Sequence, residues 1–219
     1  MGKIFFTQKQ KFIFDQVKNE DFFKSDFYFT GGTALSFFYL QHRYSEDLDF
    51  FSERKFSFAK TLELVRSWAN KYSFTFTEQV SEVVHIFIIK FKNGESLKVD
   101  FGYYPYKRVE NGISYENFAV DSLLDIAINK LSTINQRSQV KDFVDLYFVL
   151  DKFTIWDLIE GVRVKFKQEL EPLVLGGDLI YIVDQFTELP RMIKPLMLEE
   201  LKIFFHKKAL ELGFKKVEK

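Results

Sequence analysis

The chain has 219 residues, which predicts one compact unit, or a catalytic lobe with a helical appendage, rather than several domains. Its hydrophobic content of 47% excludes extensive disorder, and its 31 basic and 31 acidic residues leave no global positive field to attract nucleic acid or membrane. The absence of Cys excludes disulfides, thiol nucleophiles and cysteine-ligated metals. No uncharged run reaches the ~20 residues that span a bilayer, so we expect no membrane segment and a cytoplasmic location.

The N-terminal part alternates between helical and extended patterns. Apolar residues recur at helical spacing after the capping residues Thr7 and Ser57, whereas they are continuous or alternate in two short runs typical of strands. In chain order we expect a helix over 8–19, a strand over 27–30, a helix over 33–41, a strand over 47–51 and a helix over 57–71.

The remainder divides into a β-rich middle and a helical end. Asn93-Gly94 is a strong hairpin signal between two of the β-rich runs, which predicts an antiparallel sheet there. The fold class we expect is α+β, with one lobe over 1–118 and a helical lobe over 119–219. The β-rich runs are 73–77, 83–91 and 97–102, and the helical patterns are 121–136, 140–151, 154–169 and a weaker region over 178–210 broken by Gly176-Gly177, Pro190 and Pro195.

Three aspartates have the spacing of a metal site. Asp47 and Asp49 are two apart on a predicted strand, so both carboxylates project from one face, about 6.6 Å apart at Cα. Alone, the pair is better explained as two solvated side chains on an exposed strand face. Asp100 adds a third acid on a strand whose hairpin could lie beside them, and three carboxylates can hold two divalent ions, which clamp the attacking and leaving oxygens at phosphorus.

A glycine turn precedes these acids. Gly31, Gly32 and Thr33 stand between a predicted strand and a predicted helix, so backbone N–H groups, a helix N-terminus and a hydroxyl could face a triphosphate. A Gly pair by itself is more often a simple turn. No GxxxxGK[ST] or GxGxxG motif is present, so neither a Walker loop nor a dinucleotide site is expected.

The segment GGTALSFFYLQHRYSEDLDFF resembles the signature of the nucleotidyltransferase superfamily, and its HRYSEDLDF part is similar to the abortive-infection toxins of the AbiEii/AbiGii type. A second segment, NKLSTINQR followed by KDFVDLY, is similar to the downstream Lys…Arg…Asp-x-x-Asp-Leu pattern of that family. The resemblance covers about 27–150 and implies a mixed-sheet nucleotidyltransferase lobe, followed by a helical lobe that contributes nucleotide- and acceptor-binding residues.

The resemblance implies an enzyme of a toxin–antitoxin or phage-defence system that moves a nucleoside monophosphate from an NTP to an acceptor hydroxyl and releases pyrophosphate. It implies Mg²⁺, with two ions, an RNA 3′ end such as that of tRNA as acceptor, and a co-encoded antitoxin that need not touch the protein. The alternatives are a non-catalytic module on the same fold and transfer to a small molecule such as an antibiotic. The implied site residues are Asp47, Asp49 and Asp100 for metal and catalysis, Lys130 for catalysis and nucleotide binding, and Gly31, Gly32, Thr33, Arg43, Ser45, Arg137, Asp142 and Asp145 for nucleotide binding.

Several of these residues also have simpler interpretations. Lys130 and Arg137 are about 10.5 Å apart along one helix and could meet one triphosphate, or could extend from a core helix into water. Asp142 and Asp145 share a helix face and could orient those cations, or Asp142 could act only as a first-turn acid. Other residues with two interpretations are His42 and Arg43, which could contact phosphate or face solvent, and Ser45, which is more typical of a turn hydroxyl than of a nucleophile.

Overall fold

The computed structural model describes residues 6–134 and 136–217, which fall into two units. The first unit comprises the chain up to Phe37, Ser45–Lys107 and Asn111–Asp121, and the second comprises Phe38–Tyr44, Arg108–Glu110 and the chain from Ser122 on. The expected domain boundary between 118 and 119 stays a prediction. The observed units differ from the expected lobes because two short segments, Phe38–Tyr44 and Arg108–Glu110, belong with the C-terminal helices.

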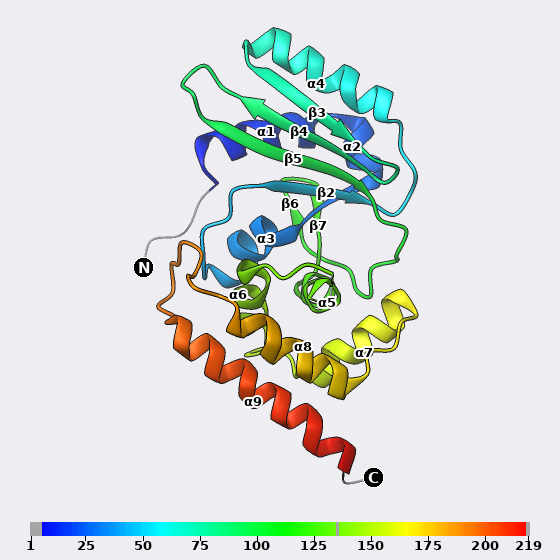
Figure 1. Ribbon diagram of the computed structural model, residues 1–219. Helices are drawn as coiled ribbons and strands as arrows, with labels where there is room; N and C mark the ends of the chain where they lie inside the picture. Colours follow the sequence, from blue (N-terminus) through cyan, green and yellow to red (C-terminus); the bar gives the residue numbers. More distant parts are fainter. Residues whose placement is uncertain (1–5, 135, 218–219) are drawn as a thin grey trace. The chain divides into compact units, whose positions relative to one another are not determined.

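In the first unit, the described strands form one mixed sheet in the order β3-β4-β5-β2-β1-β7-β6 (Figure 1). β4 and β5 are antiparallel and joined through Gly94, whose φ of +85° suits a tight turn, so the hairpin prediction is confirmed. β2 and β5 are parallel. The strands are β1 Phe27–Thr30, β2 Leu48–Ser52, β3 Thr75–Val80, β4 Val84–Lys90, β5 Ser96–Tyr103, β6 Ser114–Tyr115 and β7 Phe118–Val120, the last two of which were not predicted.

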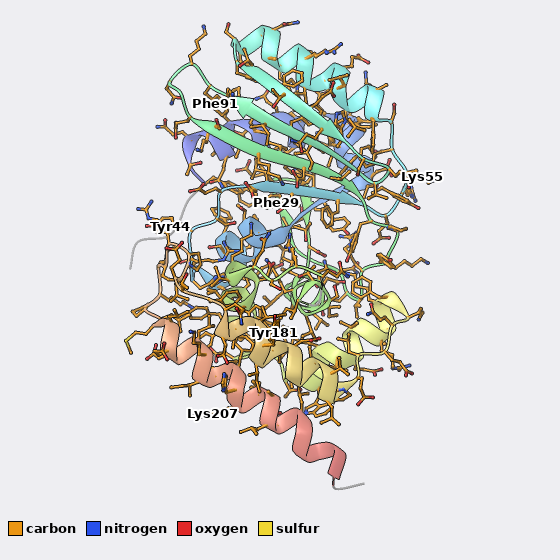
Figure 2. The ribbon with its side chains drawn as sticks, in the orientation of Figure 1. Phe29, Tyr44, Lys55, Phe91, Tyr181 and Lys207 are labelled. Atoms are coloured by element: carbon orange, nitrogen blue, oxygen red, sulfur yellow. The ribbon has the colours of Figure 1, made fainter. Side chains whose placement is uncertain are left out.

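One face of this sheet carries an aromatic core. Phe50 stacks on Phe101 with ring centroids 5.5 Å apart, and Phe101 stacks on Phe23 of α2 (Asp21–Asp26) at 4.7 Å. Phe29, labelled in Figure 2, is fully buried in the same core. Because side chains alternate along a strand, Asp49 and Asp100 project from the opposite face. The aromatic core therefore fixes the face on which the acids stand.

Helices α1 Gln8–Asn19, α2 Asp21–Asp26 and α4 Phe58–Tyr72 belong to this unit. α1 begins with a capping box at Thr7 and α4 begins after the Ser57 cap, so both predicted helices are confirmed. α2 was not predicted, because its six residues are too few to show helical periodicity. The helix expected over 33–41 instead begins at Gly31 as α3 (Gly31–Ala34) and continues as a π-helical turn over Leu35–Leu40.

The second unit is helical in the part of the chain from Ser122 on. α5 and α7 begin at the side-chain caps Ser122 and Thr154, which confirms these predicted helix starts. Asn135, at the end of the first of them as predicted, lies outside the described residues. The helices are α5 Leu123–Thr133, α6 Val140–Val149, α7 Ile155–Phe166, α8 Pro172–Asp184 and α9 Leu198–Val217.

The glycine pair Gly176-Gly177 does not interrupt the fold as predicted, because it lies inside α8. α8 packs on α9, and a Cβ at Gly176 would lie 3.2 Å from the carbonyl oxygen of Ala209. The glycine therefore permits close approach of two helices rather than a break. The prolines Pro190 and Pro195 do lie between α8 and α9, as predicted. Among the described residues, no helix combines the length and the apolar character needed to cross a membrane.

Candidate active site

The turn at the end of β1 lies directly against an aspartate. Gly31 follows Thr30, whose Cα pairs with that of Asp49 on the neighbouring strand. Gly31 has a φ of +75°, and a Cβ added to it would lie 2.8 Å from Asp49 Cγ, so side-chain-bearing residues are disfavoured by both backbone and space. The sequence thus leaves room for the Asp49 carboxylate beside the N-terminus of α3.

The two residues after Gly31 complete the turn. Gly32 lies in the first turn of α3, and Thr33 is almost fully buried. The Thr33 hydroxyl donates to the carbonyl of Asp47 and lies 2.9 Å from Ser45 Oγ. These bonds fix the segment that leads into β2, which favours the interpretation of Ser45 as a turn hydroxyl. The expectation that Thr33 binds a nucleotide stays a prediction.

Asp49 and Asp100 are brought together by strand pairing. Their Cα atoms are direct partners in the parallel β2–β5 ladder, where neighbouring strands lie about 4.8 Å apart. Both side chains are partly exposed, and Lys98, two residues earlier on the same strand face, forms an ion pair with Asp100. Like charges directly opposite each other are destabilising, so a site that keeps both carboxylates needs positive charge there.

The oxygen donors of this pair suit a hard divalent cation, because Mg²⁺ is usually held by one or two carboxylates together with substrate phosphates. The Asp49 carboxylate occupies the space that a side chain at position 31 would take, so it lies directly against the glycine turn. Within 6–134 and 136–217, no three acidic or histidine side chains converge on a single cation position. Asp47 lies one residue before β2, and its carbonyl is held by Thr33. The structure therefore pairs Asp49 with Asp100, and the metal-binding role of Asp47 stays a prediction.

In the second unit, Asp145 is the centre of a buried charged network. Its side chain is fully buried and accepts two bonds from Arg43, from Nε at 2.6 Å and Nη2 at 2.7 Å. It also accepts a bond from His42 Nε2 at 2.7 Å, and Lys130 Nζ lies 2.5 Å from Oδ2. Burial opposes ionisation, but the charges of Lys130 and Arg43 and the hydrogen bond from His42 outweigh it and hold the pKa of Asp145 well below its usual value.

Asp142 extends the same network. Lys130 Nζ donates to Asp142 Oδ1 at 2.7 Å, and Arg137 Nε lies 2.9 Å from Asp142 Oδ2. Asp142 is fully buried and lies in the first turn of α6, so it is a first-turn acid that also binds these two cations. Lys130 is only 6% exposed and does not extend into water, whereas the Arg137 side chain is 48% exposed. Asp142 and Asp145 thus orient both cations, as one of the two interpretations expected.

His42 and Arg43 do not face solvent, because both are buried against Asp145. Burial lowers the pKa of His42 despite the neighbouring carboxylate, so its imidazole is neutral near pH 7. The ionised Asp145 can only accept, and His42 Nε2 therefore donates. The sequence gives no signal for this pairing, since the partners are 103 and 102 residues apart.

A second buried ion pair was also missed. Lys165 Nζ on α7 donates to Asp125 Oδ1 at 2.6 Å, and both side chains are fully buried. The backbone N–H groups of Val109 and Glu110 donate to the same carboxylate at 2.9 and 3.1 Å. These bonds hold the segment Arg108–Glu110 in the helical unit, and together with Lys165 they lower the pKa of Asp125.

A mixed sheet with a glycine turn beside paired aspartates on adjacent strands is the arrangement of a nucleotidyltransferase. The chain belongs to the family of nucleotidyl transferase AbiEii toxins of type IV toxin–antitoxin systems, whose model matches residues 15–218. It is a nucleotidyltransferase of that toxin family, and the α+β mixed-sheet fold predicted from the sequence is confirmed.

Individual proteins are similar over most of their length. The uncharacterized protein aq_aa25 of Aquifex aeolicus (strain VF5) is 32% identical over 194 residues, which cover 85% of this chain and 88% of that protein. The structure of JHP933 from Helicobacter pylori matches with a TM-score of 0.59 at 21% identity, covering 96% of this chain and 94% of that one. A proposed nucleotidyltransferase from H. pylori matches with a TM-score of 0.60 at 20% identity, covering 96% and 97%. These two structures share the fold.

Proposed function

We propose that the protein transfers a nucleoside monophosphate from an NTP to the 3′-terminal hydroxyl of an RNA, with tRNA as the acceptor, in a Mg²⁺-dependent reaction. The observation that carries the proposal is the in-register pair Asp49 and Asp100, with the Asp49 carboxylate lying directly against the Gly31 turn. In this scheme Asp47, Asp49 and Asp100 hold two Mg²⁺ ions, and Gly31, Gly32 and Thr33 bind the triphosphate. Bound Mg²⁺ supplies positive charge at the oxygens of the reacting phosphate.

The reaction is an in-line displacement at the α-phosphorus. The acceptor oxygen forms a bond to phosphorus, the bond from phosphorus to the bridging oxygen of the β-phosphate breaks, and pyrophosphate leaves. An oxygen of the Asp100 carboxylate takes the proton of the acceptor hydroxyl. The nucleotide-binding roles of Arg43, Ser45, Lys130, Arg137, Asp142 and Asp145 remain predictions. In Arg43 and Lys130 the charge is already shared with buried carboxylates, which favours a positioning role for them.

The acceptor class is tested by following the label. We expect incubation with each α-labelled NTP, Mg²⁺ and a mixture of cellular RNA, protein and metabolites to place label in RNA, because a terminal ribose hydroxyl is unhindered and can reach the α-phosphorus. Label in protein or metabolites alone would contradict the RNA acceptor and leave nucleotidyl transfer intact. An NTP-dependent thermal shift with no pyrophosphate release under any acceptor would favour a non-catalytic binding module.

The toxin role, with the cytoplasm as its compartment, is tested by growth. We expect expression of the chain in a bacterial host to inhibit growth, and Asp47→Asn to relieve the inhibition, because the substitution removes one charge from the proposed metal ligands. A gene encoded next to this one should suppress the inhibition whether or not its product binds the chain. Equal growth of the two strains, at equal protein levels, would argue against a toxic activity that depends on Asp47.

A further inference from the structure

Two segments far apart in sequence lie side by side in the second unit. The segment that joins α8 to α9 forms an antiparallel bridge between Met192 and Arg43. The N–H of Tyr44 donates to the carbonyl of Arg191 at 2.9 Å, and the N–H of Ile193 donates to the carbonyl of His42 at 2.9 Å. The joining segment therefore has a fixed position against the residues that immediately precede the Asp47–Asp49 motif.

This backbone pairing places an aromatic ring and a cation next to each other. The Arg191 guanidinium carbon lies 4.0 Å from the centre of the Tyr44 ring. Tyr44, labelled in Figure 2, is 43% exposed, and Arg191 is exposed as well. Tyr44 is thus not a core residue. The Tyr44 ring and the Arg191 guanidinium together form a large flat surface that is exposed.

The local charge suits a polyanion. Neither 37–45 nor 189–197 contains an acidic residue, although Glu46 and Glu188 flank these ranges, and 189–197 adds Arg191 and Lys194. Single-stranded nucleic acids bind where aromatic rings and Arg guanidinium groups stack with bases and nearby cations meet phosphates. Tyr44 precedes Asp47 by three residues, so chain geometry keeps their Cα atoms within about 11 Å. The Tyr44 backbone is therefore close along the chain to the aspartate motif.

We propose that Tyr44 and Arg191 form a stacking platform for an unpaired nucleotide near the 3′ end of the RNA acceptor, with Lys194 contacting its phosphate. The inference rests on the proposed RNA acceptor and adds the residues that recognise it. A base stacks on the exposed part of the Tyr44–Arg191 pair, and the remaining guanidinium N–H groups donate to phosphate or base oxygens.

The test is RNA binding without NTP, measured by fluorescence anisotropy with a labelled hairpin that ends in an unpaired 3′ tail. We expect Tyr44→Ala to weaken binding about tenfold or more, since loss of one base–aromatic stack has an effect of this size. Arg191→Ala should weaken it similarly and reduce its salt dependence. Tyr44→Phe, which keeps the ring, should stay within about threefold of wild type. Lys207→Ala on α9, which removes an exposed charge elsewhere in the unit, serves as the matched control.

Tight binding of the tailed hairpin by Tyr44→Ala would overturn the platform, and so would an equal loss for Lys207→Ala. A blunt hairpin that binds as tightly as the tailed one would overturn the recognition of an unpaired nucleotide. Thermal melting of each variant separates lost contact from lost folding, because a folded Tyr44→Ala that fails to bind supports the platform. Since no NTP is present, failure of nucleotidyl transfer leaves this result unchanged. Transfer to protein that depends on Tyr44, with no RNA binding by wild type, would refute the RNA assignment.

Discussion

Asp49→Ala should lower the turnover of nucleotidyl transfer by roughly 10²–10⁴, which corresponds to about 3–5 kcal/mol of transition-state stabilisation. The reason is geometric: the Asp49 carboxylate lies directly against the Gly31 turn, which is the proposed phosphate site, and Asp49 pairs with Asp100 on the next strand. In the proposed scheme it is therefore the carboxylate placed to hold a cation against a phosphate. Pyrophosphate release at saturating NTP and acceptor measures the effect. A variant that keeps more than half of the wild-type turnover would exclude Asp49 as a metal ligand.

Two controls separate lost chemistry from lost folding. Asp49→Asn keeps the size of the side chain and removes its charge, so it should lose activity without a large drop in Tm; the repulsion between Asp49 and Asp100 is also relieved. Asp15→Ala, at a partly exposed position of α1 where the carboxylate pairs with Lys11 and Lys18, removes a carboxylate from the same unit and should leave turnover within about twofold of wild type. A loss of turnover in Asp15→Ala comparable to that in Asp49→Ala would mean that the assay responds to charge in general.

The secondary structure around the acids could be predicted because its signals are local. Thr7 and Ser57 were expected as caps just before the apolar pattern of a helix, and each does begin one. Ser122 and Thr154 cap α5 and α7 in the same way, although only the helical patterns of these segments were predicted. Alternation likewise placed Asp49 and Asp100 on faces opposite to their apolar neighbours. Their direct pairing depends on the parallel register of β2 with β5, which is set by the packing of distant segments and has no local signal.

The elements that the sequence did not predict are short or depend on tertiary contact. β6 and β7 have two and three residues, too few for a periodic pattern, and β7 is held by parallel pairing with β1. Gly176-Gly177 has the local signature of a break but lies inside α8, where Gly176 packs against Ala209 of α9. The partners of Asp145 also depend on tertiary contact, because the residues that bind it are spread over more than 100 positions of the chain.

Asp145→Ala should destabilise the second unit by about 3–5 kcal/mol, which is the usual consequence of removing one partner of a buried ion pair. The substitution leaves Arg43 and Lys130 buried with only Asp142 remaining in their network, and it removes the acceptor of His42. For a chain of this size the expected fall in Tm is on the order of 10 °C. Thermal and urea unfolding followed by circular dichroism measure both quantities.

The matched control is Asp151→Ala, an exposed aspartate just after α6, which should change stability by no more than about 0.5 kcal/mol. Asp145→Asn adds a second comparison, because it keeps hydrogen-bonding atoms but not the charge. If Asp145→Asn is as stable as wild type, hydrogen bonding rather than charge holds the network. If Asp145→Ala is as stable as Asp151→Ala, the network makes no net contribution to folding.

The pH dependence gives the sharpest test, because the folded pKa of Asp145 lies well below its ordinary value of 3.8. A carboxyl whose pKa is depressed by folding contributes its full stability above the unfolded pKa, and loses it as pH falls toward the folded pKa. The stability difference between wild type and Asp145→Ala should therefore be constant between about pH 6 and 8 and shrink below about pH 4. His42 acts at higher pH, because the unfolded imidazole binds a proton near 6.5 while the buried one stays neutral. The free energy of unfolding of the wild type should accordingly begin to fall below about pH 6.5. For Asp145, the contradicting outcome is a stability difference between wild type and Asp145→Ala that grows rather than shrinks below pH 4, because the folded protein would then not contain an ionised Asp145.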